Sequence, residues 1–585
     1  MLLSRGTKKT SVLRELCEAH GLLVPLRFLR SESVPRGITS TLCFYIFFFE
    51  YLSPIPHTMY QELGRFYMNI TYNNIHMDRI KCKTVSQLSL QDDINLPEAS
   101  PDLSKIIFRE GNVVLSDVKV SKDHVTLGGT LEVFLLYLTE DDNEELARID
   151  GKIPFSEAVY VEGAQPGDTM DVSFKIEDLS ISVINSRKLS ARSIVTFCLQ
   201  SEILYDEEAA CDLEDGEHIE YRRKQMELAR LAVCKRDIYR LKQELELPSH
   251  MPNIFRIIWQ SVKISSIDFK PMDDKIAIGG ELSVFLMYES TQENDNLQYY
   301  ETTVPFSGSI DCMGSREMMI PDIRYCISGR NFEVRPDFDG EERGFSMELV
   351  LDLCIKLYEE EKISILSDVY GTEKDVEADV KKGTFRKVLV RNNGTCRLNE
   401  KIHVEGNPQI LQLIHSEGEV YTQECNMTEE GVQVEGVILM KCLYVTSDDK
   451  TPYSSLEQTI PFTYLLEAKG AGKETISSIR VTLEQLAVSM QDAKELEAKI
   501  ALDVAGILFE EFEEELVTDI REKEPDKAMR RKLPGIVVHV VTKEDSLWQI
   551  GKKYYMPVNR IKEMNNLSGD ELRPGDKLLL VKERT

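Results

Sequence analysis

Three stretches of the chain decide its fold because they repeat one another: GGTLEVFLLY at 128–137, GGELSVFLMY at 279–288 and EGVILMKCLY at 435–444. Each stretch ends in a tyrosine, a phenylalanine follows eighteen residues later, and a proline stands thirty-six residues earlier. These anchors are Pro101, Tyr137 and Phe155, then Pro252, Tyr288 and Phe306, then Pro408, Tyr444 and Phe462. The copies are 151 and then 156 residues apart, which indicates a repeated domain rather than a solenoid unit.

Within each copy the pattern is that of β-structure. Apolar and β-branched residues alternate along HVTLGGTLEVFLLYL (124–138) and KIAIGGELSVFLMYE (275–289), which predicts half-buried strands. The glycine pairs inside them indicate a bulge or a close backbone approach. We expect short helices at PDLSKIIF (101–108) and PNIFRIIW (252–259), and a connecting helix at 217–233. Each repeat is therefore predicted to be an antiparallel β-rich domain with one or two short helices.

Length and charge exclude several classes of protein. A chain of 585 residues with 42% hydrophobic residues forms several domains and is not disordered as a whole. The net charge is −29, and residues 59–520 alone carry −37, so this body repels nucleic acid and anionic lipid. The C-terminal residues 521–585 are mildly basic. We expect no nucleic-acid partner.

Motifs that carry chemistry are missing from the sequence. The twelve cysteines include no C-x-x-C pair, and no H-E-x-x-H, G-x-S-x-G or G-x-G-x-x-G pattern occurs. GAGKET at 470–475 resembles the end of a phosphate-binding loop, but Glu467 and Glu474 replace the required glycine and hydroxyl residue, so an exposed turn is predicted. Acidic runs such as FEEFEEE (509–515) lack calcium-loop spacing and predict a solvated face. We therefore expect no metal, no cofactor and no enzyme activity.

Residues 1–58 differ from the rest of the chain. Their apolar run, Leu42–Phe49, is shorter than the roughly 20 residues that cross a bilayer, so no transmembrane helix is predicted. We expect this extension to lie outside the folded protein, with Met59, Met68 or Met77 as later starts. The alternative is a membrane-associating segment.

The C-terminal residues form a separate pattern. After a charged linker at 521–534, residues 535–585 predict a strand at 537–541, helices at 546–554 and 557–565, and a strand at 577–581. Ser546 is a natural N-cap, and Pro557 suits a helix start. Asp545-Ser-Leu-Trp548, Asn565-Asn-Leu567 and Leu572-Arg-Pro-Gly575 follow in order. With these motifs the segment resembles a LysM domain, which implies a βααβ fold.

The LysM resemblance also implies a binding site. LysM domains commonly bind N-acetylglucosamine polymers in a groove between two loops, which here would be lined by Glu544, Asp545, Ser546, Leu547, Asn566, Leu567 and Ser568. The implied core residues are Trp548, Ile550, Ile561 and Pro574. Glu544 stands where the family usually has glycine, and His539 where it usually has an aromatic residue. Both departures are compatible with a changed ligand.

The repeats resemble the SPOCS domain. Shared features are the lead from Leu96-Pro97 to Asp102 and from Leu247-Pro248 to Asn253, the strand ending in tyrosine, and the Pro-Phe-Ser/Thr turn; the third copy departs with Val404 in its lead. Three SPOCS repeats followed by LysM are similar to the SipL-type spore coat morphogenetic proteins of clostridia, counterparts of stage VI sporulation protein D. The predicted organisation is an extension (1–58), repeats at 75–215, 216–372 and 373–520, a linker (521–534) and a LysM domain (535–585).

This resemblance implies a function. The protein would be a non-enzymatic scaffold of spore coat assembly, located in the mother-cell cytoplasm at the forespore surface. Its LysM domain would bind the coat basement-layer ATPase, stage IV sporulation protein A, and other coat proteins would be further partners. The alternative is a peptidoglycan-binding protein of the cell wall or cortex. A cortex hydrolase is disfavoured because no catalytic constellation occurs.

Overall fold

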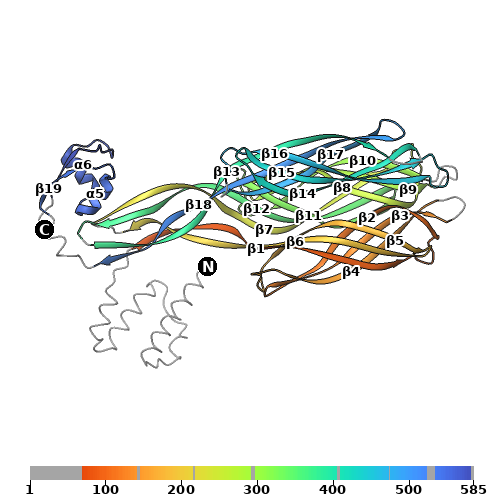
Figure 1. The fold of residues 1–585 in the computed structure, drawn as a ribbon, viewed down its shortest axis with the longest axis horizontal. Helices are drawn as coiled ribbons and strands as arrows, with labels where there is room; N and C mark the ends of the chain where they lie inside the picture. The colour runs from red at the N-terminus through yellow and green to blue at the C-terminus, as the bar shows by residue number, and fades with distance from the viewer. Residues whose placement is uncertain are drawn as a thin grey trace, which may run out of the picture. The chain divides into compact units, whose positions relative to one another are not determined.

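The computed structural model describes residues 69–140, 145–214, 218–290, 297–373, 375–404, 409–472, 475–523 and 534–581. The extension predicted at 1–58 lies outside the described residues. The chain divides into two units, Met1–Tyr67 and Met68–Thr585, and the second contains all elements described below. Among the described residues, eighteen strands come first, and two helices flanked by two short strands follow near the C-terminus (Figure 1).

The same six-stranded unit occurs three times (Figure 1). The strands of the first repeat are β1 (Asn69–Asn95), β2 (Leu103–Ser121), β3 (His124–Thr139), β4 (Leu146–Tyr160), β5 (Met170–Asn185) and β6 (Lys188–Glu214). Those of the second are β7 (Ile219–Glu246), β8 (Ile254–Met272), β9 (Lys275–Ser290), β10 (Leu297–Asp311), β11 (Ile320–Pro336) and β12 (Glu342–Gly371). Those of the third are β13 (Asp375–His403), β14 (Ile410–Met427), β15 (Gly431–Thr446), β16 (Tyr453–Glu467), β17 (Thr475–Met490) and β18 (Glu495–Lys523).

Each repeat folds as two antiparallel three-stranded sheets. In the first repeat the sheet orders are β2-β3-β4 and β1-β6-β5, and the other two repeats follow the same plan. The predicted alternation is confirmed in β3, where Val125, Leu127, Gly129 and Leu131 are buried and the residues that alternate with them are only partly buried. They share one core with Val195 and Phe197 of β6 in the other sheet. Each repeat is therefore a small β-sandwich.

The repeated anchor residues have a structural explanation. The hydroxyl of Tyr137 donates a hydrogen bond to the carbonyl of Pro101 at 3.0 Å, and Tyr288 does the same to Pro252 at 2.9 Å. The offset of thirty-six residues therefore recurs because a buried tyrosine forms a hydrogen bond with the segment that leads into the second strand of its repeat. Pro408 lies outside the described residues.

The glycine pairs mark a close approach. Gly129 lies opposite Phe155 in the β3–β4 pairing, and a Cβ atom on this glycine would come within 2.8 Å of the phenylalanine ring. Gly280 and Gly436 face Phe306 and Phe462 in the same way. At each glycine the phenylalanine ring and a backbone carbonyl of the other neighbouring strand occupy the space that a side chain would need.

The helices predicted within the repeats are wrong. Residues 103–108 and 254–259 begin β2 and β8, and the predicted connecting helix is the start of β7. Although this segment is rich in helix formers, β7 pairs with β12 along its whole length, and that non-local pairing overrides local propensity. Adjacent Ile107 and Phe108 are both buried because the β2 register shifts between Ile106 and Phe108.

The first and last strands of each repeat are unusually long and extend beyond the sandwich as two-stranded ribbons (Figure 1). We call these extensions ribbon 1 (69–80 with 202–214), ribbon 2 (219–231 with 358–371) and ribbon 3 (375–388 with 509–523). A register shift marks the inner end of each. The three ribbons share one apolar core, made of Ile75, Met77, Ala209, Met226, Leu228, Ile363, Ile365, Phe385 and Leu516.

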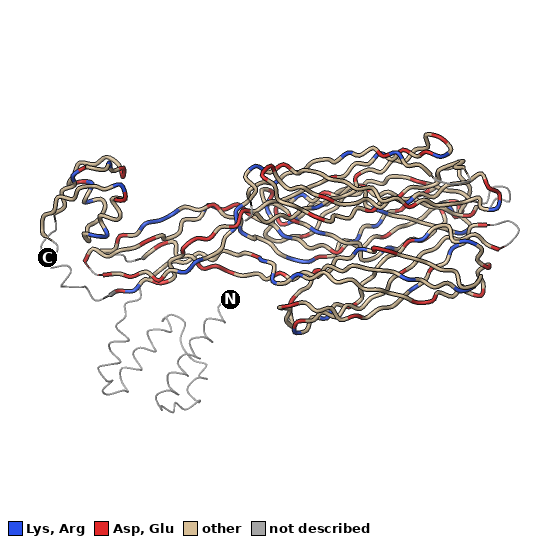
Figure 2. Tube along the Cα trace, in the orientation of Figure 1, with Lys and Arg blue, Asp and Glu red and all other residues tan. Residues whose placement is uncertain are grey.

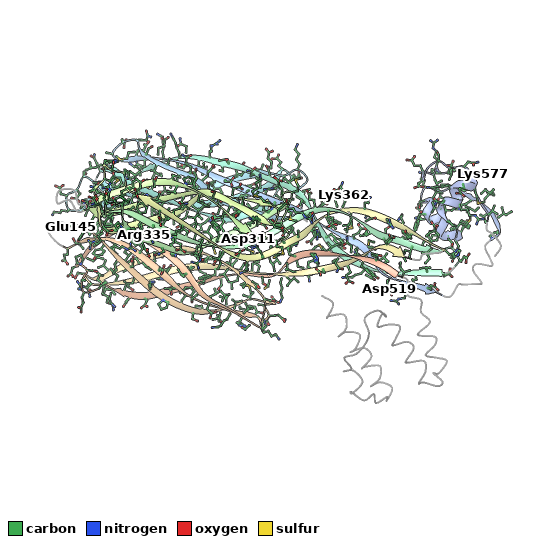
Figure 3. The ribbon with its side chains drawn as sticks, turned by 180° about the vertical axis from the view of Figure 1, so that it is seen from behind. Glu145, Asp311, Arg335, Lys362, Asp519 and Lys577 are labelled. Atoms are coloured by element: carbon green, nitrogen blue, oxygen red, sulfur yellow. The ribbon has the colours of Figure 1, made fainter. Side chains whose placement is uncertain are left out.

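Ion pairs also join the ribbons. Acidic and basic residues are interspersed along them (Figure 2); Figure 3 labels Lys362 of ribbon 2 and Asp519 of ribbon 3. Lys224 pairs with Glu514 at 2.5 Å, linking ribbons 2 and 3, and Lys381 pairs with Glu207 at 2.9 Å, linking ribbons 3 and 1. The acidic run at 509–515 therefore lies on a strand that contacts neighbouring ribbons.

The three sandwiches meet at a second shared core. Phe108, Trp259 and His415 each stand twenty-nine residues before the anchor tyrosine of their repeat, and Trp259 contacts both of the others. The ring centroids of Phe108 and Trp259 are 4.6 Å apart, and those of Trp259 and His415 are 5.1 Å apart. Equivalent positions meeting at one point indicate a pseudo-threefold arrangement of the repeats.

The C-terminal module has the predicted βααβ order. It consists of β19 (Ile536–Val540), α5 (Leu547–Tyr554), α6 (Val558–Asn565) and β20 (Lys577–Val581), and β19 pairs antiparallel with β20. Ser546 is the N-cap of α5, as predicted. Gly470, in the turn between β16 and β17, has a φ of +89°, which glycine adopts freely, and Lys473 and Glu474 lie outside the described residues.

Candidate binding site of the C-terminal module

The module has its own apolar core. Val541, Leu547, Ile550, Met556, Ile561, Leu578 and Leu580 are buried against one another. Ser546 and Gln549 form a capping box, in which the Ser546 hydroxyl accepts from the Gln549 backbone and the Gln549 side chain accepts from the Ser546 backbone. Leu547 and Ser546 thus position the loop that precedes α5.

Asp545 is held inside this first loop. Its carboxylate accepts the backbone N–H of Thr542 at 2.8 Å, the Thr542 hydroxyl at 2.9 Å, and lies 2.9 Å from Nε2 of His539. The bond from the Thr542 backbone and the contact with His539 lower the pKa of Asp545 to about 2. The histidine that departs from the family pattern therefore fastens the loop to β19. Sequence reasoning gave His539 no such role.

The second loop is fixed by Asn565. Its side-chain amide donates to the carbonyls of Ile561 at 2.8 Å and Leu579 at 2.9 Å, and its oxygen accepts the Leu579 N–H at 2.6 Å. Asn566 follows in the left-handed conformation with φ 51° and ends α6. The sequence motif contained both asparagines, but only Asn566 was predicted as a site residue. Asn565 is the one that joins α6 to β20.

The seven predicted groove residues have different environments. Glu544, Asn566 and Ser568 are exposed and form the accessible rim. Asp545 and Ser546 are engaged in the bonds above, Leu547 belongs to the core, and Leu567 packs against it. The rim that can contact a ligand is therefore smaller than the predicted lining.

The four residues predicted to form the core of the module also lie in different environments. Ile550 and Ile561 are buried in the module. Pro574 is exposed, because the turn before β20 places it at the surface. Trp548 lies outside this core and donates from Nε1 to the Asp368 carboxylate at 2.7 Å, a partner in β12 of the second repeat. The amphipathic indole needs a polar partner, which that aspartate supplies.

The outer face of the module's sheet is apolar. Ile536, Val538 and Val540 alternate along β19 with exposed fractions of 66%, 58% and 52%, and Leu579 on β20, directly opposite Val538, is 40% exposed. We call these four residues the sheet face. Because the inward residues of both strands build the core, the sheet face is the opposite side of the same sheet.

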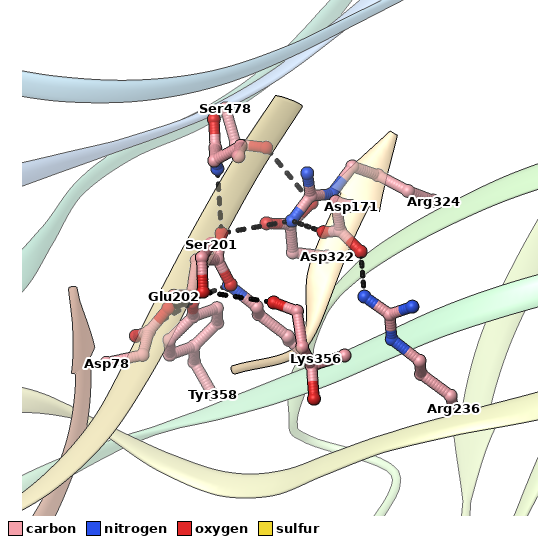
Figure 4. Close-up of polar contacts among 12 residues, drawn as sticks. Asp78, Asp171, Ser201, Glu202, Arg236, Asp322, Arg324, Lys356, Tyr358 and Ser478 are labelled. Carbon is pink, nitrogen blue, oxygen red and sulfur yellow. Dashed lines mark hydrogen bonds and ion pairs between the residues drawn. The ribbon is translucent and has the colours of Figure 1, made fainter. Parts of the chain in front are cut away.

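A cluster of charged side chains lies where the ribbons leave the sandwiches (Figure 4). Lys356 pairs with Asp78 at 2.8 Å and with Glu202, and Tyr358 donates to Asp78 at 3.2 Å. Arg386 of the third repeat approaches Asp78 to 3.7 Å. Burial alone would lower the pKa of Lys356, but the two carboxylates hold it above its ordinary value. The cluster joins side chains of all three repeats and has a structural role.

A metal site and a membrane-spanning helix are not found in the part of the chain described above. Within it, no group of three or more His, Cys, Asp or Glu side chains is placed to hold a metal ion. Nor is any helix among these residues long and apolar enough to span a membrane. The candidate surfaces are therefore the groove rim and the sheet face.

Comparison with protein families agrees with this architecture. Residues 102–184, 253–335 and 409–491 match the family described as SipL, SPOCS domain, and residues 539–581 match the LysM domain. No curated protein and no solved structure matches the chain. The protein is thus a sporulation-related protein with a terminal domain of the glycan-binding kind. More particularly, three SPOCS domains followed by one LysM domain give it the SipL-type arrangement, built from two non-catalytic domain families.

Proposed function

We propose that this protein is a non-enzymatic scaffold of spore coat assembly. In this proposal it acts in the mother-cell cytoplasm at the forespore surface and recruits the coat basement-layer ATPase, stage IV sporulation protein A, through its LysM domain. The domain arrangement supports the sporulation setting. The sheet face supports a protein as the ligand.

The sheet face carries the proposal. Four neighbouring aliphatic side chains on a two-stranded sheet form an apolar patch on a module of about 45 residues, and such patches mark protein contacts. A polysaccharide offers hydroxyl groups, which need polar or aromatic partners rather than valine and isoleucine. Lys577, opposite Val540, adds a positive charge beside the patch. An apolar partner surface with acidic neighbours is the matching ligand.

Glycan binding is the second candidate function. The groove rim of Glu544, Asn566 and Ser568 is exposed and polar, and the LysM match points to sugar polymers. Fewer side chains are free there than the motif implies, because Asp545 and Ser546 are engaged within the loop.

A binding assay with two variants of the full chain separates the candidates. Val538→Lys places a charge in the sheet face, and Glu544→Lys places the same charge on the groove rim; both positions are exposed. We expect Val538→Lys to weaken binding of the purified basement ATPase at least about tenfold, as substitutions at interface hot spots do, and Glu544→Lys to change it little.

The other possible results of these assays refute the scaffold proposal, change its binding site or support the second candidate. Failure of the wild-type chain to bind the ATPase would refute the scaffold proposal. If only Glu544→Lys abolished binding of the ATPase, the ATPase would bind at the groove rim and not at the sheet face. Sedimentation with purified peptidoglycan tests the second candidate, since retention that Glu544→Lys abolishes and Val538→Lys preserves would establish glycan binding at the rim.

A further inference from the structure

The ends of the three ribbons are built alike. Each has a bulge at which one residue is unpaired, Cys211, Ser367 or Thr518, and the side chain of each donates to a backbone carbonyl of the opposite strand. An aspartate follows each bulge and accepts the backbone N–H of the next residue at 2.9 Å; these are Asp212, Asp368 and Asp519. The pseudo-threefold arrangement therefore presents three equivalent carboxylates.

Of these three aspartates, only Asp368 of ribbon 2 contacts the C-terminal module among the described residues. Asp368 accepts Trp548 Nε1 at 2.7 Å and pairs with Lys552 at 2.6 Å, both on α5. Asp212 instead pairs with Arg223, and Asp519 with Arg521. Burial alone would raise the pKa of Asp368, but the bonds from Lys552 and Trp548 hold it below its ordinary value.

Tyr370 completes the contact. It is 3% exposed, its hydroxyl donates to the Met556 carbonyl at 2.8 Å, and its ring meets Trp548 edge-on with centroids 4.8 Å apart. Gly551 faces it, because a Cβ atom there would lie 2.5 Å from the Tyr370 hydroxyl. Arg222 lies over the Trp548 ring at 5.7 Å. The indole is thus held by a carboxylate, a phenol ring and a guanidinium group.

The residue two places after each aspartate distinguishes the three ribbons. This residue is Tyr370 in ribbon 2, but it is Glu214 in ribbon 1 and Arg521 in ribbon 3. Neither of these charged residues offers an aromatic face to an indole. Of the three similar ribbon ends, only that of ribbon 2 therefore has an aromatic side chain at this position, Tyr370, that can pack against Trp548 of the module.

We propose that the end of ribbon 2, formed by Arg222, Asp368 and Tyr370, is an intramolecular docking seat for the LysM module, and that Trp548 is the positioning residue that holds the module there. The groove rim and the sheet face take no part in the seat and stay exposed in the docked state. The seat thus fixes the direction in which the module presents its ligand surfaces. Trp548 acts through this contact and not as a platform for the ligand.

Fluorine NMR of the full chain labelled with 5-fluorotryptophan tests this docking directly. The chain contains two tryptophans, so the spectrum has two resonances, and Trp548→Phe assigns them. Asp368→Asn and Tyr370→Arg should each shift and narrow the Trp548 resonance as the module is released. Asp519→Asn is the matched control and should leave it unchanged. Trp259, buried in the core between the sandwiches, reports in the same spectrum whether each variant is folded.

Several outcomes would overturn the proposal. An unchanged Trp548 resonance in both folded seat variants would show that the module is not docked in solution. An equal shift with Asp519→Asn would show that ribbon 2 is not the selected end. A resonance that moves on dilution would show that the seat is filled by the module of a second copy, not by the chain's own.

Discussion

His415 is poorly accommodated in the core between the sandwiches, and its replacement by phenylalanine should stabilise the protein. Both ring nitrogens are buried without a hydrogen-bond partner, Nδ1 approaches a carboxylate oxygen of Glu301 only to 3.6 Å, and the ring stacks on Phe285 with centroids 3.9 Å apart. The equivalent residues, Phe108 and Trp259, are hydrophobic aromatics. Since a buried unsatisfied polar group costs about 1–3 kcal/mol, we expect His415→Phe to raise the free energy of unfolding by about 1–2 kcal/mol at pH 7.

The effect should grow in acid. Burial lowers the pKa of His415 to about 4, against an unfolded value of about 6.5. The unfolded chain therefore binds the proton first, and the stability present above pH 6.5 is lost as the pH falls toward 4. One pKa unit corresponds to about 1.4 kcal/mol, so at pH 4.5 the wild-type chain should lose about 2–3 kcal/mol that the variant retains.

Urea unfolding followed by far-ultraviolet circular dichroism at pH 7 and pH 4.5 measures both effects. His403→Phe is the matched control, because His403 is exposed, and it should show no widening between the two pH values. The reasoning is refuted if His415→Phe lowers the midpoint at pH 7, or if its gap from the wild type stays constant on acidification.

Three further predictions concern the repeats. Gly129→Ala should lower the free energy of unfolding by about 2 kcal/mol, because the new methyl group meets the Val114 carbonyl and the Phe155 ring, while Gly128→Ala, whose nearest atom is 3.6 Å away, should be much milder in thermal unfolding. Lys356→Met should lower the free energy of unfolding by about 3–5 kcal/mol, because it leaves Asp78 buried and poorly paired. Adding Asp78→Asn should restore part of this free energy, and no recovery in urea unfolding would contradict this account. Tyr288→Phe should lower the free energy of unfolding by about 1 kcal/mol, because it removes the hydrogen bond to the Pro252 carbonyl. Tyr160 is exposed, and Tyr160→Phe should cause no change that thermal unfolding can measure.

The repeat plan was predictable because its anchors interact within one repeat. Tyr137 and Pro101 are partners across a fixed offset, so their spacing recurs in the sequence. The connecting helix was predicted wrongly because the partner of β7 is β12, more than a hundred residues away, and local propensity contains no information about it.

Contacts between repeats were not predictable from single motifs. Asp78, Lys356 and Arg386 come from three different repeats and follow no common spacing. The LysM motif identified the loops around Asp545 and Asn566, but it could not show that Trp548 has a partner 180 residues earlier. The motif describes a free domain, whereas this contact depends on the chain to which the domain is attached.

The shared core of the ribbons has a consequence for biosynthesis. It combines Ile75 and Met77, near the start of the described chain, with Leu516, near the end of the last repeat. A ribosome therefore releases the first sandwich long before its ribbon has neighbours to cover these side chains. Such exposed apolar strands favour aggregation, so the nascent chain is most vulnerable until the third repeat has been synthesised. Chaperone binding before that point should therefore improve the yield of folded protein, and slower translation should lower it.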